Sequence, residues 1–172
     1  MNNVVVLNIV RFLSLGLAQI LIFNNMSLGR YINPSVYVLF IILLPARING
    51  SLLLIVSFMA GLTMDYFTNS MGLHASVCVA IAFMRPSIIS LFFRNYEFVS
   101  NEEVAPFSVG WQGFIKFSIV VVLLHQVLMF YLEVMSLNNF FFTLSKSLLS
   151  SAVTLIIIVI VMLIFGKRRR RI

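Results

Sequence analysis

Apolar residues are grouped along the chain into long runs that are separated by short polar turns. A membrane-spanning helix needs roughly 20 apolar residues, and most of these runs approach that length. The pattern therefore predicts an all-α integral membrane protein with about six transmembrane helices in a single membrane domain. The expected helices cover residues 4–23, 35–44, 51–65, 72–93, 114–135 and 146–165.

The second and third runs are shorter than a bilayer is thick. Pro45 ends the second run, because proline lacks a backbone N–H and disfavours helical geometry in the residue before it. Two short neighbours make a thin hairpin, which requires tilt, local thinning or extension into polar flanks. Interrupted segments of this kind often line a cavity or an interface. In the fourth run, Arg85-Pro86 predicts a kink or break.

Composition excludes an ordinary water-soluble domain. Hydrophobic residues make up 61% of the chain, charged residues make up only 10%, and the mean hydropathy is +1.07. The one clearly polar stretch, 94–113, contains Glu97, Glu102 and Glu103 and is expected to form a surface loop. Three interpretations of this loop stay open: a surface helix, a contact site for a partner, and a merely solubilising segment.

The distribution of positive charge predicts the orientation of the chain. Its net charge is +7, and Lys167 to Arg171 form a basic tail at 166–172 directly after an apolar run. This placement is typical of a cytoplasmic topology signal rather than a nucleic-acid-binding patch, with an anionic-lipid site as the alternative. Six crossings then place the N-terminus in the cytoplasm too. The remaining charges agree: Arg47, Arg94 and Lys116 fall on the cytoplasmic side, and Arg30 and Lys146 fall outside.

Asp65 is the most informative single residue, because a carboxylate at the end of an apolar helix is costly unless it is solvated or paired. Gly61 lies four positions earlier, on the same helical face. This spacing predicts that another helix approaches closely at Gly61 and offers a donor to Asp65. The alternative is a solvated aspartate at the end of its helix.

Two ionisable residues, Arg11 and His125, lie within apolar runs. Such groups usually face the protein interior or extend toward the headgroups. His125 lies near the middle of its helix, where it is either a member of a proton relay or a neutral packing histidine. Small residues form further close-packing seams, which we expect to join the chain's own helices. They are Ser57 with Gly61, Ser76 with Ala80, and Ser147, Ser151 and Thr154.

Motifs for catalysis, cofactors and metals are absent from the sequence. There is no Cys/His cluster with metal spacing, no phosphate-binding glycine loop and no Ser/His/Asp pattern. Cys78 is the single cysteine, so no intramolecular disulfide is possible. His74 and Asp65 can come together across a turn, but two residues without a nucleophile define no reaction. We therefore expect no enzyme activity, no cofactor and no metal.

The stretch from Gly61 to Ala75, GLTMDYFTNSMGLHA, followed by Arg85-Pro86, resembles the central region of the MreD family. Further similarity lies in the segment 19–25, in Pro34 and in Pro45, and the length and the helix count also agree. The resemblance makes six residues candidate structural or partner-binding positions: Gly61, Asp65, Gly72, His74, Arg85 and Pro86.

Membership of this family would imply a non-catalytic subunit of the cell-elongation machinery in the bacterial inner membrane. Such a subunit binds the single-pass protein MreC and is linked through it to the MreB filament and to the peptidoglycan polymerase and transpeptidase, which control cell shape. The family is similar in helix layout to the substrate-binding subunits of energy-coupling-factor transporters. A small-molecule-binding transporter subunit is therefore the main alternative, with Arg11, Asp65 and His125 as its only obvious ligands. A lipid-processing enzyme is a third.

Overall fold

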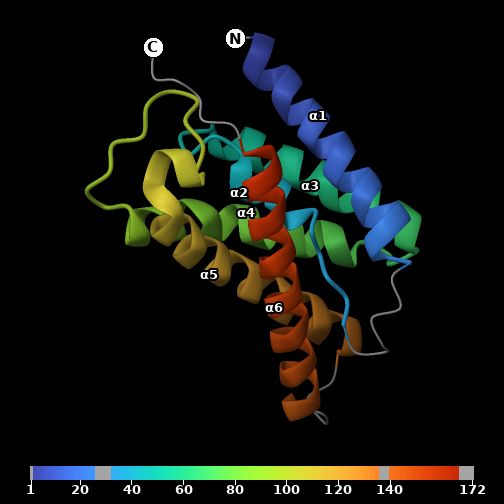
Figure 1. The fold of residues 1–172 in the computed structure, drawn as a ribbon. Coiled ribbons are helices and arrows are strands. Elements are labelled where there is room, and N and C mark those ends of the chain that lie inside the picture. Colours follow the sequence, from blue (N-terminus) through green and yellow to red (C-terminus); the bar gives the residue numbers. More distant parts are fainter. Residues whose placement is uncertain (1, 26–31, 136–139, 167–172) are drawn as a thin grey trace.

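The computed structural model describes residues 2–25, 32–135 and 140–166, and these residues form helices, turns and no strand. Within these residues, five helices are long and apolar enough to cross a membrane. A multi-pass membrane fold accounts for their length and composition (Figure 1). In chain order the elements are α1 (Asn2–Ala18), the π-helical turn η1 (Gln19–Phe23), α2 (Val38–Leu43), α3 (Gly50–Thr68), α4 (Leu73–Phe92), α5 (Pro106–Val134) and α6 (Phe140–Phe165).

Successive segments run in opposite directions between two ends of the bundle. At one end, the middle of α1 meets the loop before α5, because Arg11 Nη1 lies 2.8 Å from Glu103 Oε1. The turn after α2 reaches the same place, where Ala46 N donates to Glu102 O over 2.7 Å. We call this the Glu103 end. The opposite end, which we call the Asp65 end, contains η1, the α3–α4 turn, the last turn of α5 and the first turn of α6.

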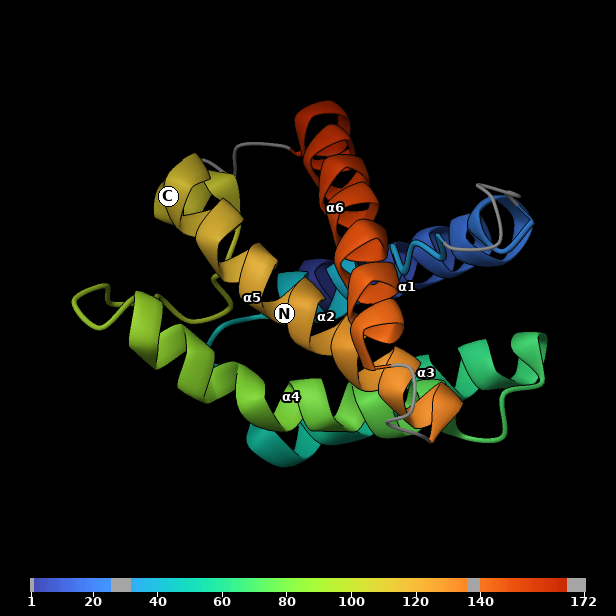
Figure 2. The ribbon, with the colours of Figure 1, turned by 90° about the horizontal axis from the view of Figure 1, so that it is seen from below.

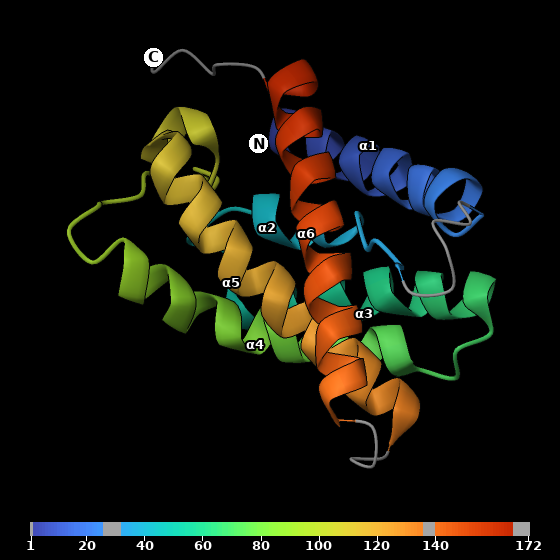
Figure 3. The same cartoon turned by 60° about the horizontal axis from the view of Figure 1, so that its bottom comes forward.

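Packing follows the chain from α3 to α6. Helices α3 and α4 lie side by side and antiparallel, α4 packs on α5, and α5 crosses α6 (Figures 2 and 3). Helix α1 joins this group mainly through α2, where the Phe12 and Phe40 ring centroids are 5.4 Å apart. Apolar side chains such as Val5, Ile55 and Leu163 are exposed on the outer faces. Outer faces of this kind suit contact with lipid.

The second crossing is not the continuous helix that we expected at 35–44. Only Val38–Leu43 is helical, residues 32–37 are irregular, and Leu44 leaves the helix with ψ of 151°. The chain is buried throughout from Pro34 to Pro45. Buried backbone N–H and C=O groups need partners within the protein wherever the backbone is irregular. We call residues 32–45 the broken crossing, because they stand where the second membrane crossing was expected.

The expected break at Arg85-Pro86 is wrong, because α4 continues as a helix through both residues. Proline removes one backbone hydrogen bond from a helix. The Pro86 ring is exposed on the outer face of α4, while Arg85 is buried on the inner face. The ring therefore meets no neighbouring helix, and the contacts of α4 with α3 and α5 keep the helix intact.

The boundaries of the last two helices also differ from our expectation. Helix α5 begins at Pro106, not at 114, so the polar loop of 94–113 ends at 105. Proline suits the first turn of a helix, and a left-handed Gly110, with φ of 75°, separates this turn from the rest of α5. Helix α6 begins at Phe140, not at 146. Arg30 and the basic tail lie outside the described residues.

Candidate functional site

The interior of the bundle contains polar side chains that bind the backbone of the broken crossing. The first is Gln19, which is 5% exposed in the π-helical turn. Its Oε1 accepts from Val36 N at 2.7 Å and from Tyr37 N at 3.4 Å, while its Nε2 donates to Pro34 O at 2.9 Å. Val36 and Tyr37 directly precede α2, so Gln19 holds the backbone of the turn that leads into this helix.

Helices α5 and α6 bind the irregular residues before α2. Asn33 N donates to Ser150 Oγ and Ser35 N donates to Thr154 Oγ1, each over 3.1 Å. The Thr154 hydroxyl donates its own proton to Ser150 O, which leaves its lone pairs free to accept. From α5, Gln126 Nε2 donates to Asn33 O over 3.1 Å. The small polar residues of α6 therefore bind backbone as well as allowing close packing.

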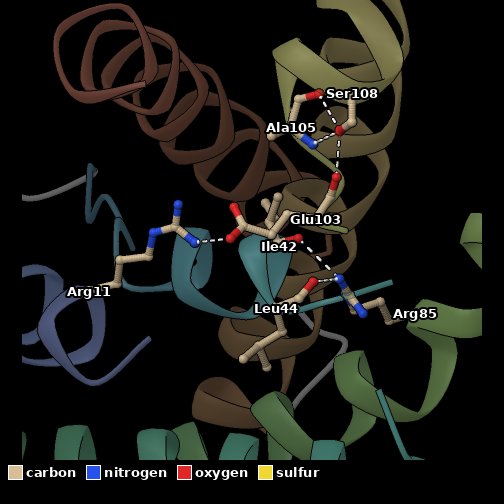
Figure 4. Close-up of polar contacts among 7 residues, drawn as sticks. All are labelled: Arg11, Ile42, Leu44, Arg85, Glu103, Ala105 and Ser108. Atoms are coloured by element: carbon tan, nitrogen blue, oxygen red, sulfur yellow. Dashed lines mark hydrogen bonds and ion pairs between the residues drawn. The ribbon is translucent and has the colours of Figure 1, made fainter. Parts of the chain in front are cut away.

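Arg85 binds the other end of α2. It is 0% exposed, and its guanidinium donates to Ile42 O and Leu44 O (Figure 4) and also to Pro45 O. The last carbonyls of a helix lack partners and carry partial negative charge. Arg85 supplies both the donors and the positive charge that these carbonyls need. The broken crossing is thus held from η1, α4, α5 and α6.

An ion pair closes the Glu103 end beside Arg85. Arg11 comes from α1 and Glu103 from the loop before α5, and both side chains lie next to the C-terminal turn of α2 (Figure 4). They are 24% and 12% exposed. Arg11 therefore neither extends freely toward headgroups nor lines an empty pocket. It joins α1 to the α4–α5 loop.

Asp65 lies in a second polar cluster at the other end of the bundle. Its Oδ1 accepts from Ser70 Oγ at 2.6 Å and from His74 N at 2.9 Å, and its Oδ2 accepts from Ala75 N at 2.8 Å. The carboxylate thereby caps α4, where a negative charge also suits the helix dipole. At 6% exposure it is not the solvated aspartate of the alternative interpretation.

Glycines permit the geometry of this cluster. A Cβ on Gly61 would lie 2.5 Å from Ala75 Cα, so the predicted close approach of another helix at Gly61 is confirmed. Gly72 has φ of 91°, in the left-handed region that favours glycine. The structure thus brings Gly61, Asp65, Gly72 and His74 together. Arg85 and Pro86 lie apart from them, toward the other end of α4.

A third cluster joins three rings in the interior. The Tyr37 hydroxyl lies 2.8 Å from His74 Nδ1 and 2.8 Å from His125 Nε2. His125 is 0% exposed, and its Nδ1 has no hydrogen-bond partner among the described residues. Tyr37, the residue directly before α2, thus connects α4 with α5.

Sequence reasoning missed Gln19 and Tyr37 as structural centres. The signal for Gln19 was present, because it is a polar residue within an apolar run; nothing in the sequence marks Tyr37. Most of the expected close-packing residues, including Ser57, Ser147 and Ser151, are buried. Ser76 is exposed, so the expectation that Ser76 and Ala80 join two of the chain's own helices is wrong.

The surface at the Asp65 end is hollowed where α3 turns into α4. Leu62, Asp65, Tyr66, Asn69, Met71 and Gly72 line this open hollow. In the part of the chain that the structure describes, no three His, Cys, Asp or Glu residues are grouped to hold a metal ion. Comparisons with known protein families, curated proteins and solved structures found no match to this chain.

Proposed function

We propose that this chain is a non-catalytic membrane subunit of the bacterial cell-elongation machinery, located in the inner membrane and bound directly to an MreC-like single-pass protein. The proposal rests on the resemblance of residues 61–86 to the MreD family and on one structural observation. The interior polar side chains are used to hold the chain's own segments together. A subunit of this kind gives its partner a fixed surface and influences peptidoglycan synthesis and cell shape through it.

The observation that carries the proposal concerns the three residues that a transporter subunit would need as ligands. Arg11 pairs with Glu103, Asp65 accepts three hydrogen bonds at the start of α4, and His125 contacts the Tyr37 hydroxyl. A pocket for a small molecule needs polar groups that converge on the ligand. These three contact protein atoms instead, and Arg11 lies at the opposite end of the bundle from Asp65. Because these polar side chains are occupied within the protein, a scaffold is favoured over a small-molecule carrier.

In the proposed orientation the Glu103 end faces the cytoplasm. Arg47 and Arg94 are exposed and lie in the segments that meet at this end. Helix α6 also ends there, since a Cβ on Gly166 would meet the Phe107 ring at 2.7 Å. Positive residues near membrane helices favour the cytoplasmic side. Both chain termini would then be cytoplasmic, and the Asp65 end would face outward.

The test is to purify the tagged chain from its native membrane in mild detergent and to identify stoichiometric copurifying proteins and small molecules by mass spectrometry. We expect an MreC-like single-pass protein. A bound vitamin-sized ligand together with ATPase subunits, and no single-pass partner, would overturn the proposal in favour of a transporter component.

The contact face can be mapped with photo-reactive residues at exposed positions of separate helices. Leu13, Ile55 and Ile160 lie on the outer faces of α1, α3 and α6 and are about half exposed or more. If a partner helix packs against one face, cross-links to it concentrate at one of these positions while the others capture lipid. Equal, weak capture of the same protein at all three positions would contradict a defined interface.

A further inference from the structure

In the His74–Tyr37–His125 cluster, the hydrogen-bond geometry restricts which residue donates to which. A tyrosine hydroxyl donates only one proton, so it cannot donate to both imidazole nitrogens at 2.8 Å. One histidine must donate to the tyrosine oxygen instead. Two arrangements satisfy this requirement, and they differ in which nitrogen of His125 carries the proton.

Burial of His125 selects between the two arrangements. If Tyr37 donated to His125 Nε2, the proton of a neutral His125 would sit on Nδ1, which is buried and without a partner among the described residues. Buried N–H groups without an acceptor are rarer than acceptors that lack a donor. His125 therefore carries its proton on Nε2 and donates to Tyr37. The Tyr37 hydroxyl then donates to His74 Nδ1.

This direction places the accepting end of the cluster where protons can reach it. His74 is partly exposed in the first turn of α4, whereas Tyr37 and His125 are buried. The ionisable groups around the cluster come from every element packed on it. They are Asp65 of α3, whose Oδ1 accepts from His74 N, Cys78 of α4, which lies beside Tyr37, and His125 of α5. Partial burial of His74 disfavours a cation there, whereas the facing Asp65 carboxylate favours one.

We propose that His74 is a pH-sensitive latch on the broken crossing. When His74 gains a proton, its Nδ1 becomes a donor and the Tyr37 hydroxyl loses its acceptor. Both histidines then donate to the tyrosine oxygen, and the tyrosine proton is left to the neighbouring Cys78 sulfur, which accepts weakly. Acid conditions at the Asp65 end thus loosen the hold on Tyr37, directly before α2.

The test uses the full chain in lipid nanodiscs. Nitrogen-15 NMR of the histidine side chains at pH 7.5 reports the protonated nitrogen of His125, which we expect to be Nε2. Backbone hydrogen exchange of residues 32–45, corrected for the intrinsic effect of pH, is then compared at pH 7.5 and pH 5. Loss of one ordinary hydrogen bond predicts exchange faster by about two- to tenfold at pH 5, with a segment of α6 as the internal reference.

Two variants separate the latch from general acid effects. His74→Gln keeps an acceptor for Tyr37 but cannot gain a proton, so its corrected exchange is expected to be the same at both pH values. Tyr37→Phe removes the shared hydroxyl and is expected to exchange faster at both. Three results would each overturn the proposal: His125 protonated on Nδ1 at pH 7.5, wild-type exchange that does not respond to acid, and a response retained in His74→Gln. The NMR result stands even if a variant folds poorly.

Discussion

Arg85 combines three properties that are costly in a membrane protein: a charge, complete burial, and a position directly before a proline. Its guanidinium contacts carbonyl oxygens rather than a carboxylate, since the ion pair found among the described residues is Arg11–Glu103. A buried charge without compensation is strongly unfavourable. The partial charges at the C-terminal end of α2 supply the compensation here.

Replacing Arg85 by methionine should destabilise the protein far more than the same change at a surface arginine. Arg85→Met leaves Ile42 O, Leu44 O and Pro45 O without their donor, and each unsatisfied buried group costs about 1–3 kcal/mol. We expect a loss of roughly 3 kcal/mol or more in reversible unfolding by denaturant in micelles. Arg94→Met, at an exposed turn, is the control and should change stability by less than about 0.5 kcal/mol. Equal effects would contradict the capping role.

A methyl group at Gly61 should separate α3 from α4. The added Cβ would meet the backbone of His74 and Ala75 at 2.5–2.6 Å, and backbone cannot turn aside as a flexible side chain can. We expect Gly61→Ala to cost about 1–3 kcal/mol in the same unfolding measurement. Gly50→Ala is the matched control, because nothing lies within 4 Å of its Cβ, and it should be neutral or slightly stabilising. A stable Gly61→Ala variant would refute the close contact.

Among the elements, the broken crossing depends most on the rest of the molecule. Helix α2 has only six residues, which is too short to be stable alone. Its ends are bound by Gln19 and Arg85, and the irregular residues before it are bound from α5 and α6. The element therefore exists because its neighbours supply the hydrogen bonds that a continuous helix would make internally.

Removing the hydrogen bonds of Gln19 should loosen the broken crossing selectively. Gln19→Met keeps the apolar volume but removes the acceptor of Val36 N and the donor of Pro34 O. We expect a loss of about 1–3 kcal/mol in stability and faster backbone hydrogen exchange at residues 34–38, with α6 unchanged. Gln112→Met, at an exposed position of α5, should leave both readouts at their wild-type values. Uniformly faster exchange along the whole chain would point to global unfolding instead.

Patterns within single segments predicted the long helices of the fold, but they did not predict the contacts between distant segments. Apolar runs predicted the long helices, and the i, i+4 spacing of Gly61 and Asp65 predicted their shared contact with the start of α4. The starts of α5 and α6 were placed too late, because first turns such as 140–145 contain polar residues that a helix accepts. The broken crossing could not be derived, since its hydrogen bonds join Asn33 and Ser35 to residues more than a hundred positions away.

At the scale of the whole molecule, the two ends differ in the residues they present. The Asp65 end exposes Met71 completely and Tyr66 at 78%, whereas the Glu103 end exposes the charged Arg47, Arg94 and Glu97. Apolar and aromatic side chains suit a membrane boundary, and positive side chains suit the cytoplasmic side. This difference makes the proposed orientation testable.

Cysteine labelling from the two sides of the membrane provides that test. Cys78 is fully buried, so the wild-type chain should not react with a membrane-impermeant maleimide. In intact spheroplasts we expect Met71→Cys to be labelled and Asn95→Cys, in the α4–α5 loop, to be protected until the cells are lysed. The opposite pattern would show that the Asp65 end faces the cytoplasm. Labelling of the wild-type chain would contradict the burial of Cys78.

The distant contacts of the broken crossing also determine when the protein can be completed during synthesis. Asn33 and Ser35 leave the ribosome early, but Ser150 and Thr154 follow them by 117 and 119 residues. Until α6 is inserted, these backbone groups have no partner on that side, and hydrocarbon offers them none. The nascent chain must therefore keep this segment near water or within the insertion machinery, and an unfinished chain presents quality-control proteases with an unprotected stretch close to its N-terminus.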